Sequence, residues 1–112
     1  MDTEIRFVIE LLLARYRDGV GCHWEYVDGG ETYRYYLDSR VSFTVGIKKY
    51  GSVDVYQLII CDNNKKIVDK EWCATELNDR DLMLLTGLYE VARKDKAAII
   101  KVITKLLEDP NN

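Results

Sequence analysis

The chain has 112 residues and a formal net charge of -3, with 47% hydrophobic and 31% charged residues. This length suits one domain with a single core, and the composition is that of a folded, water-soluble protein. Its apolar runs are far shorter than the roughly 18 residues that a membrane-spanning helix needs. The acidic balance opposes the approach of a polyanion, so general nucleic-acid binding is disfavoured. We expect one α+β domain over residues 1–112, with a loose tail at 109–112.

Residues 4–16 predict an amphipathic N-terminal helix. Apolar side chains recur there at spacings of three and four, and charged side chains occupy the other side. Asp2 or Thr3 is expected to cap the start of the helix, and Gly19 with Gly21 to end it. A secretory signal carries basic residues at its start, where this chain is acidic, so we expect a cytoplasmic protein.

The middle of the chain predicts a meander of antiparallel strands. Short stretches rich in β-branched and aromatic residues alternate there with turn residues. The predicted turns are Gly29-Gly30, Asp38-Ser39-Arg40, Tyr50-Gly51-Ser52 and Asp62-Asn63-Asn64-Lys65. The predicted strands cover residues 23–28, 31–37, 41–49, 53–61 and 66–72. In the third strand, Val41, Phe43, Val45 and Ile47 alternate with small polar residues. We expect these four side chains to face the core and the other side of the sheet to face water.

Asn78 marks the start of a second helix, because it is a good N-cap and Asp81 would complete a short capping box. The apolar stripe that follows continues as far as Leu107. An unbroken helix over residues 79–108 would be about 45 Å long, which exceeds the width of a compact domain of this size. A bend at residues 94–96 is therefore favoured. The expected fold class is α+β: an N-terminal helix, an antiparallel meander of four to five strands, and a C-terminal helix or bent helical pair on one face of the sheet.

No pattern in the sequence predicts catalysis, a cofactor or a metal. His23 is the only histidine, and a small enzyme would have to combine it with Cys61 or Cys73. The three cysteines, which include Cys22, are odd in number and irregularly spaced, so we expect unbridged thiols that bind no zinc. Cys22 and His23 are also adjacent, and neighbours on a strand point to opposite faces.

Tyrosine is concentrated in the predicted meander, which holds six of the eight tyrosines. Tyr33, Tyr35 and Leu37 are expected in the buried phase of their strand, with Arg34 and Tyr36 facing outward. Exposed tyrosines can simply pair across strands and shield small neighbours. They can also form a contact surface, because tyrosine combines a large rigid area with a polar tip. The sequence leaves both interpretations open.

The expected function is that of a non-enzymatic protein-binding or regulatory module that acts through a tyrosine-bearing sheet face. Small acidic modules of bacteria and phages that lack catalytic machinery include inhibitors, immunity proteins and chaperones. The candidate partner-binding residues are Arg34, Tyr36, Lys48, Lys49 and Tyr50. One alternative is an accessory nucleic-acid-associated domain with a basic rim, formed by Arg34, Lys48, Lys49, Lys65 and Lys66. The other is a small enzyme that uses His23 with a cysteine.

The last helix carries more apolar surface than one core-facing stripe needs. A symmetric homodimer would cover the excess, because twofold pairing lets one patch complement itself. The candidate dimer residues are Ile99, Ile100, Ile103 and Leu107. The alternative is that the first helix packs beside the last and absorbs the excess.

Overall fold

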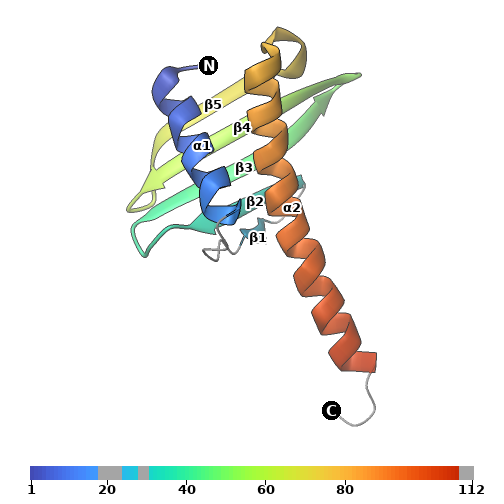
Figure 1. The fold of residues 1–112 in the computed structure, drawn as a ribbon. Helices are drawn as coiled ribbons and strands as arrows, with labels where there is room; N and C mark the ends of the chain where they lie inside the picture. Colours follow the sequence, from blue (N-terminus) through green and yellow to red (C-terminus); the bar gives the residue numbers. More distant parts are fainter. Residues whose placement is uncertain (18–23, 28–30, 109–112) are drawn as a thin grey trace.

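The computed structural model describes residues 1–17, 24–27 and 31–108, except for the side chains of residues 17, 95–102 and 105. Two α-helices pack on a five-stranded antiparallel sheet (Figure 1). The elements are α1 (Thr3–Arg17), β1 (Trp24–Val27), β2 (Glu31–Tyr36), β3 (Val41–Tyr50), β4 (Val53–Asp62), β5 (Lys65–Cys73), the 3-10 helix η1 (Ala74–Glu76) and α2 (Asp79–Glu108). This order confirms the predicted α+β class.

The sheet is a meander in which each strand pairs with the next, in the order β1-β2-β3-β4-β5. The predicted strands are close to the observed ones because local turn chemistry marks their ends. Asn63 and Asn64 join β4 to β5 with positive φ angles of 50° and 67°, which a tight two-residue hairpin needs and asparagine tolerates. Gly51 joins β3 to β4 with a φ of 65°. The predicted turn at Gly29-Gly30 lies outside the described residues.

Both helices lie on one face of the sheet, and no described residue covers the other face (Figure 1). The core lies between the helices and this covered face. The sheet contributes these buried side chains to it: Trp24, Tyr33, Tyr35, Phe43, Val45, Tyr56, Leu58 and Ile60. Val41 and Ile47 are half-buried against the same core. The predicted orientation of β3 is therefore confirmed, as is the burial of Tyr33 and Tyr35.

Leu37 departs from the prediction of burial. It follows the last residue of β2, lies in a bend, and is 43% exposed. The alternation of side chains along a strand holds only while the strand continues. Because β2 ends at Tyr36, the pattern that buries Tyr33 and Tyr35 does not extend to Leu37.

Asp2 and Asn78 cap the two helices. The backbone N–H of Glu4 donates to Asp2 Oδ1 at 2.8 Å, and the N–H of Asp81 donates to Asn78 Oδ1 at 2.8 Å. Both bonds satisfy donors that the first turn of a helix leaves free. The Asp81 carboxylate pairs with Arg6 on α1 rather than completing a capping box. The predicted end of α1 at Gly19 and Gly21 lies outside the described residues.

α2 is one helix of 30 residues, so the predicted bend at residues 94–96 is wrong. At about 1.5 Å per residue the helix is about 45 Å long, and its second half runs beyond the sheet (Figure 1). The longest dimension of the molecule is 52 Å, and its radius of gyration is 15.4 Å, against about 13 Å for a compact chain of this length. The prediction failed because it assumed that the whole helix must fit within the compact body. No glycine or proline interrupts residues 88–108.

The described helices lack the features of a membrane span. None of them combines the length and the apolarity that crossing a bilayer requires. The second half of α2 is amphipathic rather than uniformly apolar, since Arg93, Lys94 and Glu108 accompany its leucines.

Candidate functional site

The open face of the sheet is the side that neither helix covers (Figure 1). Because successive strand residues alternate between faces, the pairing register defines its members row by row. Tyr36 on β2 lies opposite Ser42 on β3, which lies opposite Cys61 on β4. In the next row, Arg34 lies opposite Thr44. The same alternation places the other outward candidates, Lys48 and Tyr50, on this face.

One end of the open face carries an apolar surface, which we call the open-face patch and define as Tyr36, Ile59, Cys61 and Ile67. Tyr36 is 47% exposed and Ile67 is 63% exposed. Ile59 and Cys61 are half-buried on β4 between them. A register irregularity at Ile60 and Cys61 interrupts the β4–β5 pairing at this point. Such irregularities leave an extra residue unpaired and redirect side chains.

Sequence reasoning identified Tyr36 but missed the other three members of the open-face patch. The available signal was the run Leu58-Ile59-Ile60-Cys61, in which apolar residues occupy successive positions of one strand. Such a run places apolar side chains on both faces of a sheet. Periodicity alone does not show which of the two faces a helix will cover.

Small side chains form the middle of the open face along β3. Ser42 and Thr44 are 8% and 7% exposed although no helix covers them. Arg34 from β2 reaches Thr44, with Nε donating to Oγ1 at 3.4 Å. A Cβ atom at Gly46 would lie 2.9 Å from Thr32 Oγ1, a distance below normal contact. Larger side chains on β2 and β4 therefore flank a row of small ones.

Ion pairs on the open face involve two of the predicted basic residues. Lys48 Nζ lies 3.1 Å from Glu71 Oε1, and Lys66 Nζ lies 3.6 Å from Asp69 Oδ2. The hydrogen bond to Glu71, together with its negative charge, raises the pKa of Lys48. Gln57 Nε2 also donates to Asp69 Oδ1 at 3.2 Å. Nearby carboxylates therefore partly neutralise the charges of Lys48 and Lys66.

The five predicted rim residues do not lie together. Lys48 and Lys49 sit near the β3–β4 turn, and Lys65 and Lys66 sit near the β4–β5 turn, at the other end of β4. Lys49 and Lys65 lie on the helix side of the sheet, opposite Asp54 and Asp62. Arg34 lies on β2 in the row next to Tyr36, three strands away from β5. The structure thus does not bring the five residues together.

The exposed tyrosines of the open face also lie far apart. Tyr50 is 60% exposed and pairs with Val53 beside the β3–β4 turn. Tyr36 pairs with Ser42, eight residues earlier on β3. At about 3.4 Å per residue these two rows are about 27 Å apart. Arg34 and Tyr36 therefore belong to one end of the face, and Lys48 and Tyr50 to the other.

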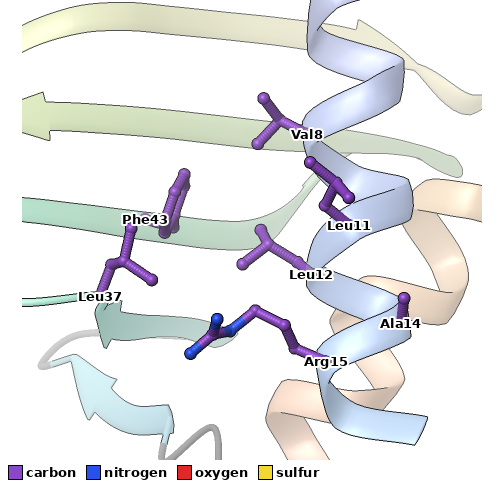
Figure 2. A pocket seen from close by; sticks show the side chains of 7 residues that line it. All are labelled: Val8, Leu11, Leu12, Ala14, Arg15, Leu37 and Phe43. Atoms are coloured by element: carbon purple, nitrogen blue, oxygen red, sulfur yellow. The ribbon is translucent and has the colours of Figure 1, made fainter. Parts of the chain in front are cut away.

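A concave feature lies between α1 and the sheet, on the covered side (Figure 2). It is a pocket of about 450 Å³. Its lining consists of Val8, Leu11, Leu12, Ala14, Arg15, Leu37 and Phe43. α1 supplies five of these residues, and Leu37 and Phe43 face them from the bend after β2 and from β3 (Figure 2). The lining is mostly apolar and includes one charged group, the guanidinium of Arg15 (Figure 2).

Sequence analysis did not predict this pocket. Three consecutive leucines at residues 11–13 widen the apolar side of α1 beyond the stripe that faces α2, and this was the available signal. The alternation of side chains along β2 did not predict the exposure of Leu37, which follows the last residue of this strand. The pocket thus depends on a strand end that only the folded chain defines.

Cys61 and Cys73 do not form a reactive pair in the described part of the chain. Both are unbridged and half-buried. Cys61 lies near one end of β4, and Cys73 on β5 lies opposite Val55 near the other end of β4. Cys22 and His23 lie outside the described residues, so the predicted combination of His23 with a thiol is not addressed. Within residues 1–17, 24–27 and 31–108, no group of three or more histidine, cysteine, aspartate or glutamate side chains is arranged to hold a metal ion.

Comparison of the chain with protein-family models, curated proteins and solved structures finds no match. No relative therefore assigns a role to any residue.

Proposed function

We propose that the protein is a non-enzymatic protein-binding module whose contact surface is the open-face patch. The observation that supports this proposal is the exposure of Tyr36 and Ile67, at 47% and 63%, on an ordered sheet face beside Ile59 and Cys61. Grouped apolar surface is uncommon on a monomer unless it has a partner. Tyrosine and arginine are also enriched at protein interfaces, and Arg34 lies in the adjacent row.

The charge of the open face favours a protein partner over a nucleic acid. The described residues of this face include as many acidic as basic side chains. They are Glu25, Asp69 and Glu71 against Arg34, Lys48 and Lys66. Binding to a phosphate backbone requires cations that are free to replace counterions. A mixed charge pattern around an apolar centre instead matches the rim of a protein interface.

The end of the sheet that carries the open-face patch is held by hydrogen bonds. Arg40 Nη2 donates to Asp62 Oδ2 at 2.9 Å, and the Arg40 Nε forms a second bond to Asp62 Oδ1. Asp38 Oδ1 accepts from the backbone N–H groups of Arg40 and Val41 at 2.8 and 2.7 Å. These bonds tie the β2–β3 bend to the end of β4. A surface that is ordered before binding loses less conformational entropy when the partner docks.

Within this proposal, an inhibitor, immunity or chaperone-type role in a bacterium or phage is the function we infer. The small acidic chain supports that inference. The unbridged thiols of Cys61 and Cys73 support a reducing, cytoplasmic location. The basic-rim alternative is supported by no arrangement among the described residues.

The test compares two tyrosines that share a face and an exposed environment. Wild type, Tyr36→Ala and Tyr50→Ala are used to capture partners from a native host extract, and the captured protein is then titrated in purified form. Tyr36→Ala is expected to weaken binding at least about tenfold, which is about 1.4 kcal/mol. Tyr50→Ala is about 27 Å away and is expected to change affinity less than about twofold.

Ile67→Asp provides a second test at the other side of the open-face patch. A buried carboxylate at the interface would be unpaired and costly, so this variant is also expected to lose the partner. Circular dichroism and a thermal melt establish that each variant is folded. Unchanged affinity for both Tyr36→Ala and Ile67→Asp, or capture of nucleic acid instead of protein, would contradict the proposal.

A further inference from the structure

The second half of α2 carries an apolar stripe that the described chain leaves exposed. We call residues 93–108 the distal segment. Within it, Ile103, Leu106 and Leu107 are 50%, 55% and 82% exposed. In the first half of the same helix, Leu85 and Leu88 are 0% and 1% exposed because they pack on the sheet and α1. The two halves of one helix thus have opposite environments.

The exposed stripe lies in phase with the buried one. The spacing between the two sets of residues is eighteen, which is five turns at about 3.6 residues per turn. It separates Leu85 from Ile103, Leu88 from Leu106, and Tyr89 from Leu107. Side chains separated by whole turns lie on the same side of a helix. The side that packs on the sheet in the first half therefore continues beyond the edge of the sheet (Figure 1).

α1 does not cover this stripe. α1 ends at Arg17, and it packs beside the first half of α2, where the Leu13 side chain approaches Gly87. α1 therefore packs only beside the first half of α2. It does not absorb the excess apolar surface of the second half. Ile103 and Leu107 were predicted as dimer residues and are exposed. The side chains of Ile99 and Ile100, predicted with them, lie outside the description.

Charge is divided unevenly between the distal segment and the rest of the chain. Residues 93–108 contain five basic and two acidic residues, a formal charge of +3. Because the whole chain carries -3, the remaining residues carry -6. The distal segment of one copy is therefore electrostatically attracted to the body of another, over distances of about a Debye length, roughly 10 Å at 0.1 M salt.

We propose that a second copy of this chain covers the stripe, through antiparallel pairing of two distal segments about a twofold axis. Twofold pairing lets the stripe of Ile103, Leu106 and Leu107 complement itself. Antiparallel pairing brings the end of each basic segment toward the acidic body of the other copy, and this attraction must exceed the repulsion between the two paired segments, each of charge +3. Parallel pairing would instead place two bodies of charge -6 side by side. This dimer uses a surface separate from the open-face patch.

The size of the contact sets the expected affinity. Sixteen residues of helix provide a contact about 24 Å long. A standard interface buries about 800 Å² on each partner, which is more than one helix pair of this length supplies. We therefore expect dissociation constants of about 1 to 100 μM rather than nanomolar ones. Both monomer and dimer should be observable in the usual concentration range of solution measurements.

The test compares two neighbouring residues on the distal segment. Ile103 and Thr104 are both exposed, and each is replaced by glutamate, so the added charge is the same. A helix turns about 100° per residue, so Thr104 lies beside the stripe, about 60° beyond Leu107 around the helix. Sedimentation equilibrium at about 1 to 200 μM should show a dimer for wild type and for Thr104→Glu. Ile103→Glu should weaken dimerisation at least about tenfold.

Neither variant alters a buried residue, and circular dichroism checks that both remain helical. A monomeric wild type over the whole concentration range would overturn the proposal. So would a dimer that Ile103→Glu leaves intact, since association would then use another surface. Tyr36→Ala should dimerise like wild type, which separates a failure of this proposal from a failure of the proposed partner surface.

Salt dependence tests the antiparallel arrangement. Attraction between the distal segment and the acidic body should be screened, so the dimer should be weaker at about 0.5 M salt than at about 0.05 M. A dimer that tightens with salt would overturn this arrangement.

A basic amphipathic helix also suits an anionic membrane surface. If a chain that stays monomeric in solution sediments with phosphatidylserine vesicles but not with phosphatidylcholine vesicles, the stripe is a lipid contact and the dimer is refuted.

Discussion

Arg6 and Asp81 join the first turns of the two helices through a two-point contact. Arg6 Nε donates to Asp81 Oδ1 at 2.7 Å, and Nη2 donates to Oδ2 at 3.2 Å. The Asp81 side chain is only 1% exposed, and the Met1 ammonium nitrogen lies 3.6 Å from Oδ2. A buried carboxylate is tolerated only when it is paired and hydrogen-bonded. This contact therefore fixes how α1 sits beside α2.

Removing Arg6 is expected to destabilise the fold strongly. Arg6→Ala leaves the buried Asp81 charge with only the Met1 ammonium nearby, so the loss of stability should clearly exceed that of a surface ion pair. The control is Arg80→Ala, because the ion pair of Arg80 with Glu10 joins the same two helices at the surface, with side chains 67% and 38% exposed. That pair should contribute about 0–1 kcal/mol. Urea titration measures both free energies of unfolding, and equal effects would contradict the structure.

Acid should weaken the Arg6–Asp81 contact. The hydrogen bond from Arg6, together with its positive charge, holds the pKa of Asp81 below its ordinary value of 3.8. The unfolded chain therefore binds the proton more readily than the folded one, and a falling pH favours unfolding. The stabilisation is complete above 3.8 and is lost as the pH falls through the lower, folded value.

Asp81→Asn tests this pH dependence. The variant should be less stable than wild type at neutral pH, and the difference in the free energy of unfolding should shrink as the pH falls below 3.8. Urea titrations over a series of pH values provide the measurement. A difference that is the same at neutral and at strongly acidic pH would show that the charge of Asp81 does not stabilise the fold.

The two phenylalanines of the chain should respond differently to truncation. Phe43 is 7% exposed on the covered face of the sheet, whereas Phe7 is 59% exposed on α1. Phe43→Ala should cost about 3–5 kcal/mol, the usual range for a buried phenylalanine. Phe7→Ala should stay within about 0.5 kcal/mol of wild type, as surface substitutions usually do. Thermal and urea unfolding of both variants decide the matter, and comparable losses would refute the assigned faces.

Alanine should have opposite effects at two glycines. Gly87 lies within α2, and a Cβ atom there would meet the Leu13 side chain at 3.8 Å, an ordinary contact. Gly87→Ala should therefore stabilise the fold by up to about 1 kcal/mol through helix propensity. Gly51 has a φ of 65° with open space around it, so Gly51→Ala should cost about 1–2 kcal/mol from backbone strain. A destabilised Gly87→Ala would mean that α1 and α2 pack more closely than observed.

Local patterns in the sequence predicted most of the secondary structure. The alternation of Val41, Phe43, Val45 and Ile47 gave the correct covered side of β3 because a strand has a period of two. Asn63-Asn64 and Asn78 predicted a hairpin and a helix start because each needs a conformation or a hydrogen bond within a few residues. Chemistry that acts over so short a span is the same in the sequence and in the folded chain.

The candidate surfaces depended on contacts that the sequence does not display. Ile59 and Ile67 gave no periodic signal of exposure, since the run around Ile59 is apolar at successive positions. Leu37 follows the alternation of β2 but lies beyond its end. For α2, the argument for a bend treated helix length as limited by domain width. The described helix continues past the sheet, and no glycine or proline interrupts residues 88–108.

Local residue patterns were enough to predict the strands, the hairpins, the helix starts and the side of β3 that faces the core. Tertiary contacts fixed three other features: the sheet face that the helices leave open, the point at which α2 extends beyond the sheet, and the partner of the Asp81 carboxylate. Arg6 and Asp81 are 75 residues apart in the chain, and no local pattern relates them. Such contacts form only when packing brings distant elements together, because burial and pairing depend on the whole assembled core.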